Sequence, residues 1–221
     1  ATSGQSAGFT SGIATACGLR GASLAVADAW YGTYNISAAG GRGSTAFAEA
    51  YALRTVAGGM SFGSLGGTYQ VTARGGVADG TADSSSYAAA TGLSCSGGDF
   101  GAAPIDAALR LTVNATAGSG GENANASATG IYTNKSVNIA SGFTANLQVA
   151  AIAAKSSGGT AASEAYGLRF DKSADDASVT AATIFGALGG SFTVRATGGS
   201  GGDDVIAWCY GIRSATTLSI G

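Results

Sequence analysis

The sequence predicts an all-β repeat protein, most simply a parallel β-solenoid with coils of 34–44 residues. Three observations support this fold class. One short motif recurs along the chain, short runs alternate between apolar and polar residues, and clusters of Gly, Ser, Asn and Asp separate those runs. Alternation with a period of two is typical of a half-buried strand, and the intervening clusters have the chemistry of turns.

The first repeated element is the motif Ala-x-Ala-[Tyr/Thr/Cys]-Gly-[Leu/Ile]. Ala52 replaces the glycine in the second copy, Ser163 replaces the first alanine in the fifth, and Cys209 replaces the second alanine in the sixth. Repetition at a period of roughly 20–50 residues is the signature of stacked repeats. The spacings of 34, 40, 38, 37 and 44 residues are measured at the final Leu/Ile of each copy: Leu19, Leu53, Leu93, Ile131, Leu168 and Ile212.

Two further elements recur in the same order. Segments 34–41, 69–76 and 192–199 superpose without gaps, and the runs from Leu111 and Leu147 follow the same outline. "FGSLGG" at 62–67 and "FGALGG" at 185–190 each stand just before that outline. We interpret 1–221 as a single repeat domain in which like residues stack in ladders. Its approximate units are 17–50, 51–90, 91–128, 129–165, 166–209 and a partial unit 210–221.

An antiparallel arrangement is the alternative. Short sequential strands joined by glycine-rich turns are also typical of a sandwich, a barrel or a ring. Small residues in fixed columns favour the solenoid, because close stacking of coils requires them.

Composition narrows the class of protein. Charged residues are 11% of the chain, against about 25% in ordinary globular proteins, and 38 residues are glycine. Hydrophobic residues reach 45%, but many are alanine, so we expect a thin core. The net charge of −2 and pI near 4.9 argue against nucleic acid as a partner. No apolar run approaches the roughly 18 residues that a membrane span needs, so no membrane insertion is expected. The start at Ala1 suggests a processed secreted chain or a trimmed one.

The repeat resembles those of prokaryotic cell-surface proteins, such as autotransporter-like passengers, filamentous adhesins, and sheath or surface-filament subunits. The resemblance lies in the general character of the chain, which is rich in Gly, Ala, Ser, Thr and Asn, has few charges and repeats an A-x-A-Y-G-I type motif. It implies an extracellular or cell-surface location and a structural or adhesive role. It transfers no catalytic residue.

Catalytic, cofactor and metal sites are not predicted. The absence of histidine excludes Ser-His-Asp and Cys-His catalysis and any His-containing metal site. The Asp171–Ser178 stretch and the "GGDD" ending at Asp204 match no calcium-binding loop. Three carboxylate pairs are interpreted as solvated loop residues, and a glycan-active enzyme is the least favoured function: Asp99 with Asp106, Asp175 with Asp176, and Asp203 with Asp204.

An arginine column follows the repeated motif and is interrupted by Ser94 and Tyr132. It predicts either a basic strip for anionic glycans or a neighbouring subunit, or arginines whose aliphatic stems cover a thin core. The column comprises Arg20, Arg54, Arg169 and Arg213. Four sequons predict glycosylation acceptors, namely Asn35, Asn114, Asn125 and Asn134.

The three cysteines lie too far apart in sequence for a metal or redox motif. Cys17 and Cys209 occur in the first and last copies of the motif. In a solenoid five strand spacings separate them by about 24 Å, whereas a disulfide needs Cα atoms within about 7 Å. They are therefore predicted to pair between molecules, or within one chain if the repeats close into a ring. The alternative is that Cys17, Cys95 and Cys209 are buried free thiols.

The favoured function is an extracellular structural protein that self-assembles through repeat edges into a filament, sheath or surface layer. The terminal motifs keep the ordinary repeat pattern, and unprotected strand edges are templates for another chain. The expected partners are copies of the protein itself. An adhesin or glycan-binding module acting through loops such as 169–183 is the alternative, with cell-surface glycans as partners.

Overall fold

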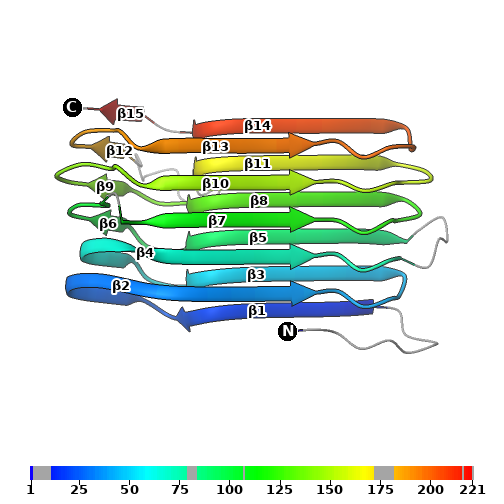
Figure 1. The fold of residues 1–221 in the computed structure, drawn as a ribbon, viewed down its shortest axis with the longest axis horizontal. Coiled ribbons are helices and arrows are strands. Elements are labelled where there is room, and N and C mark those ends of the chain that lie inside the picture. Colours follow the sequence, from blue (N-terminus) through cyan, green and yellow to red (C-terminus); the bar gives the residue numbers. More distant parts are fainter. Residues whose placement is uncertain (2–10, 79–83, 107, 172–181, 216, 221) are drawn as a thin grey trace.

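The computed structural model is an all-β solenoid of stacked parallel coils (Figure 1). It describes residues 1, 11–78, 84–106, 108–171, 182–215 and 217–220, with only the backbone of 182–185. The first coil lies at one end of the stack and the last at the other, so Ala1 and the C-terminal strand are far apart (Figure 1). The predicted parallel solenoid is confirmed, and the antiparallel alternative is wrong.

Fifteen strands make up the coils of the described residues. They are β1 (Ser11–Gly21), β2 (Leu24–Ala39), β3 (Thr45–Thr55), β4 (Met60–Arg74), β5 (Ser85–Cys95), β6 (Phe100–Ala102), β7 (Arg110–Thr116), β8 (Asn123–Thr133), β9 (Val137–Ile139), β10 (Asn146–Ile152), β11 (Thr160–Phe170), β12 (Ala182–Phe185), β13 (Ser191–Thr197), β14 (Asp204–Ser214) and β15 (Thr217–Ile220).

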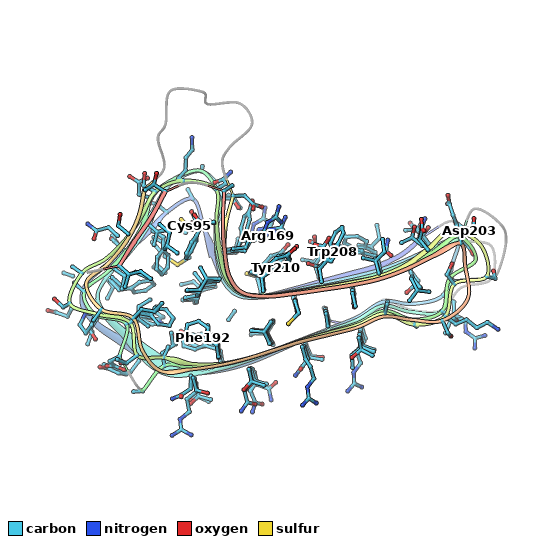
Figure 2. All side chains as sticks on the ribbon, turned by 90° about the horizontal axis from the view of Figure 1, so that it is seen from above. Cys95, Arg169, Phe192, Asp203, Trp208 and Tyr210 are labelled. Atoms are coloured by element: carbon cyan, nitrogen blue, oxygen red, sulfur yellow. The ribbon has the colours of Figure 1, made fainter. Side chains whose placement is uncertain are left out.

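Two sheets enclose the core. The six-stranded sheet has the order β1-β3-β5-β8-β11-β14, and each strand contributes one copy of the Ala-x-Ala motif. The other sheet contains a long wall, built from β7, β10, β13 and the second halves of β2 and β4. It also contains a short wall, built from β6, β9, β12, β15 and the first halves of β2 and β4. Viewed along the stack, the long wall and the six-stranded sheet close into a thin arm, which opens at one end into a wider compartment (Figure 2).

The strand register reproduces the sequence repeat. Leu19, Leu53, Leu93, Ile131, Leu168 and Ile212 stack as one continuous ladder. The second repeated element forms another ladder of Tyr34, Tyr69, Leu111, Leu147 and Phe192. The backbones of Phe62 and Phe185, from the two "FG" blocks, also fall in one column of the short wall. The predicted ladders are thus confirmed.

The core differs between the arm and the compartment. In the arm, alanines such as Ala50, Ala90 and Ala128 face valines of the long wall such as Val113, and all four are buried. In the compartment the buried side chains are large and include Tyr69, Phe100, Phe143, Leu65 and Met60. Alanine allows the two sheets to approach closely, whereas the aromatic rings fill the space where the sheets diverge.

Glycine allows adjacent coils to pack closely at the sharp bend of the six-stranded sheet. At Gly92, Gly130 and Gly167 an added Cβ would lie 2.4–2.6 Å from the carbonyl oxygen of the next coil. Ala52 is the one alanine in this column, which shows that one coil admits a methyl group there. The glycine of the repeated motif is therefore a close-packing residue, placed where two coils meet at the bend.

Candidate assembly interface

The last coil has a strand edge that no described strand covers. β13, β14 and β15 end their ladders, so the backbone groups on their outer sides face away from the stack (Figure 1). The side chains are also uncovered: Val205 is 54% exposed although it occupies an inward column, and Ile220 of the short wall is 52% exposed. An open edge with exposed apolar groups is a template for a further strand.

The first coil presents the complementary edge. β1 and β2 begin the ladders, and Ile13 on β1 is 58% exposed. One part of this edge is occupied by the chain itself, because the Ala39 amide donates to the Ala1 carbonyl and the Ala1 amino group donates to the Ser37 carbonyl. The β1 edge and the first half of β2 have no described strand on their outer side.

The two edges match column by column. Extending the ladder of the six-stranded sheet by one coil would place Ile206 against Ile13, Ala207 against Ala14 and Ile212 against Leu19. Extending the short wall would place Leu218 against Leu24 and Ile220 against Val26. Each of these five pairings joins two aliphatic side chains.

The cysteines lie at opposite ends of the six-stranded sheet and face opposite sides of it. Cys17 Sγ donates to the Leu19 carbonyl on the outward face of the sheet. Burial raises the pKa of this thiol, and the positive charges of Arg54 and Arg20 partly offset the rise. Cys209 Sγ points inward and donates to the Val194 carbonyl at 2.9 Å. In-register stacking of two copies would therefore leave these two side chains on opposite faces, a geometry that a disulfide does not bridge. The intermolecular disulfide remains a prediction for another packing of copies.

Cys95 belongs to the compartment core. It lies inside the wider compartment (Figure 2) and is fully buried. Its thiol donates to the Gly98 carbonyl at 3.2 Å, and Thr55 Oγ1 donates to its sulfur at 3.4 Å. Burial raises the pKa of the thiol. All three cysteines are free in this structure.

The arginine column lies beside the bend on the outer side of the six-stranded sheet, and acids neutralise its middle members. Arg54 pairs with Glu49 at 3.9 Å; Arg169 pairs with Glu164 at 3.6 Å and with Asp171 at 2.8 Å. The guanidinium of Arg169 also lies 4.6 Å from the centre of the Tyr166 ring. Burial alone would lower the pKa of the Arg169 guanidinium, but Asp171, Tyr166 and Glu164 together outweigh that effect and raise the pKa.

These contacts favour the structural interpretation of the column. Arg169 lies over the Tyr166 ring, and that ring stacks on the ring of Tyr210 with their centres 5.5 Å apart. Figure 2 shows Arg169 beside Tyr210 at the bend. Ser94 and Tyr132 interrupt the column between Arg54 and Arg169. The arginines thus form two separated groups and not one continuous basic strip.

The carboxylates noted in the sequence have local partners or lie on loops. Asp99 accepts from the Ser136 amide, and Asp106 accepts from the Ala108 amide and from the Tyr31 hydroxyl. Asp203 lies on an exposed turn at the tip of the thin arm (Figure 2). Asp175 and Asp176 lie outside the described residues, as does most of the 169–183 loop. Across the described part of the chain, no group of three or more Cys, Asp or Glu side chains converges as metal ligands would.

The four sequons differ in accessibility. Asn35 on β2 is exposed, whereas Asn114, Asn125 and Asn134 are half-buried. The side-chain oxygens of Asn125 and Asn134 accept hydrogen bonds from the Ala162 and Gly97 amides, which ties each asparagine to an adjacent coil. Asn35 is therefore the most accessible of the predicted acceptors.

One surface is not apparent from the sequence alone. The outer side of the long wall carries hydroxyl, amide and arginine side chains around a hollow of about 500 Å³, with Arg110 at its edge. The signal in the sequence is the absence of Asp and Glu at the outward positions of runs such as "TYQVTAR" and "RLTVNAT".

Comparison with protein families, with curated proteins and with solved structures gave no match. Among the described residues no helix has the length and apolarity to span a membrane.

Proposed function

We propose that this protein is an extracellular structural subunit that assembles head to tail through its end coils, forming a filament, a sheath or a surface layer. The observation that supports the proposal is the open edge of the last coil, whose exposed columns match those of the first coil. The composition and the character of the sequence repeat support the extracellular location.

The type of interface explains why the assembly would not close. Contact between the last coil of one copy and the first coil of the next is heterologous, and such contacts generate open filaments when no rotation closes them. Six strands per copy at about 4.8 Å each give an axial repeat of about 29 Å. The Ala1 contacts with β2 must be released for the long walls to pair completely.

The proposed interface can be tested by introducing charged residues at two positions that would face each other across it. Ile13 and Ile206 become neighbours in the proposed stack. The side chain of each points away from the core, on the solvent face of the six-stranded sheet. The double variant Ile13→Asp/Ile206→Asp should abolish assembly, because two carboxylates would face each other across adjacent strands. The double variant Ile13→Lys/Ile206→Asp should restore it, because the same positions would then attract.

Electron microscopy and sedimentation velocity of the purified chain measure the outcome. We expect filaments with the axial repeat given above for the wild type and for the Lys/Asp variant, and monomers for the Asp/Asp variant. Val77→Asp is the matched control, since Val77 is 47% exposed but lies in a loop away from both ends. A wild type that stays monomeric at high concentration, or an Asp/Asp variant that assembles like the wild type, overturns the proposal.

A further inference from the structure

The outer surface of the long wall is polar and carries no carboxylate along β4, β7, β10 and β13. We call it the polar face and define it by twelve outward side chains of β4, β7, β10 and β13. They are Thr68, Gln70, Thr72, Arg110, Thr112, Asn114, Asn146, Gln148, Ala150, Ser191, Thr193 and Arg195. Alternation along each strand places these residues outside while their neighbours fill the core.

The charge of the polar face is opposite to that of the whole chain. The chain has 13 acidic and 11 basic residues. The polar face contains two arginines and no carboxylate, and Arg74 stands at its border on β4. No described carboxylate forms an ion pair with Arg110 or Arg195. On the six-stranded sheet, by contrast, Arg54 and Arg169 are paired with acids.

The shape of the face suits an extended ligand. Two shallow hollows of about 500 and 300 Å³ adjoin, because both are lined by Thr112 and Gln148. Arg110 lines the first hollow and Arg195 the second. Their Cα atoms are two strand spacings and four residues apart, which corresponds to about 16 Å. A single small anion would meet one arginine, whereas a chain with several anionic groups would meet both.

The side chains of the polar face indicate which kind of anionic polymer would bind there. Arginine binds carboxylate and sulfate groups through two parallel hydrogen bonds. The hydroxyls and amides between the arginines both donate and accept, as sugar hydroxyls require of a partner. Single-stranded nucleic acid is bound on aromatic side chains that stack with its bases, and none of the twelve residues is aromatic.

From these observations we infer that the polar face binds an anionic polysaccharide, one that bears carboxylate or sulfate groups along an extended chain. The inference is independent of assembly, because the face lies on the side of the stack and not at its ends (Figure 2). In a filament the same face would recur in every copy, and binding would gain from multivalency.

Affinity electrophoresis with dextran sulfate and polygalacturonate tests this site. Uncharged dextran shows whether binding requires the negative charge of the glycan. Single-stranded DNA shows whether any polyanion binds equally well. We expect the wild type to be retarded by at least one of the two anionic glycans and by neither control. Arg110→Gln/Arg195→Gln should weaken that retardation by about tenfold or more, with the loss smaller at high salt.

The matched control is Arg42→Gln/Lys155→Gln, which removes the same charge from exposed loop residues. It should leave the retardation within about twofold of the wild type, because distant exposed charges are screened. The measurement is repeated in the Ile13→Asp/Ile206→Asp background, so that failure of assembly and failure of glycan binding are distinguished. No retardation of the wild type, equal losses in both double variants, or equally strong binding of DNA overturns the inference.

Discussion

β11 and β14 are neighbouring strands with nearly the same motif, yet one is buried and the other is open. Tyr166 on β11 is 1% exposed and its partner Tyr210 on β14 is 42% exposed. Ala161 is fully buried, whereas Val205 in the same column is 54% exposed. The difference arises because β11 has a strand on each side and β14 has one. The motif is therefore suited to a position between two neighbours, and β14 lacks its second neighbour.

The largest difference in stability between β11 and β14 is expected when the core Leu or Ile of each of these two strands is shortened to Ala. Leu168→Ala should lower the free energy of unfolding by about 2–5 kcal/mol, since Leu168 is fully buried between two coils. Ile212→Ala removes a similar group from a half-covered position, so less than half of that loss is expected. Urea unfolding of the monomer measures both variants. Equal losses would mean that β14 is as well packed as β11.

Placing a larger side chain at the glycine of the repeated motif should have the next largest effect on the stability of the monomer. A Cβ at Gly167 would lie 2.4 Å from the Gly211 carbonyl oxygen, whereas a Cβ at Gly211 meets nothing within 4 Å. Gly167→Val should therefore destabilise the monomer by about 1–3 kcal/mol, as urea unfolding would measure. Valine is the more sensitive probe because Ala52 shows that the column admits a methyl group.

Gly211→Val is the control for that experiment. It should change the stability of the monomer by no more than about 0.5 kcal/mol. It should nevertheless hinder assembly, because a further coil would bring a carbonyl oxygen close to that Cβ. A monomer equally destabilised by both substitutions would contradict the geometry at the end of the stack.

The last expected effect is a loss of stability that is confined to alkaline conditions. Burial, followed by the charge of Glu49, raises the pKa of Tyr51 to about 12. A raised pKa means that the folded state holds this proton more tightly than the unfolded state does. The resulting stability is complete below the ordinary tyrosine pKa of about 10 and is lost as the pH rises through about 12.

Urea unfolding at a series of pH values checks this expectation. The wild type should lose stability above pH about 10, and Tyr51→Phe should lose less. Burial also raises the pKa of Tyr87 and of Tyr166, so part of the loss should persist in the variant. A wild-type stability that does not change across this range would contradict the prediction.

The ladders are the most predictable part of the molecule. The Leu19 to Ile212 column can be aligned from the sequence because each coil repeats the same packing environment. The parallel arrangement is favoured for the same reason, since small residues in register allow coils to stack closely. The cysteine orientations are less predictable. Cys17 and Cys209 differ by one position in the motif, which sends them to opposite faces of the sheet.

The arginine column shows where sequence reasoning reaches its limit. Its members are aligned in the sequence, but only the structure shows that Glu49, Glu164 and Asp171 neutralise Arg54 and Arg169. The acid-free polar face is hard to recognise in the sequence because its residues come from four strands about 40 residues apart. Their common property is visible only when the strands lie side by side.

The repeat, its period, the all-β class and the thin alanine core of the arm all follow from the amino-acid sequence, because each is a local pattern copied from coil to coil. The wide compartment with its large buried side chains does not follow from that pattern. Which outward columns meet acids, which face is free of carboxylates and which edges are open became clear only from the folded chain. Those properties depend on distances between coils and on where the stack ends, and neither is encoded in any single repeat.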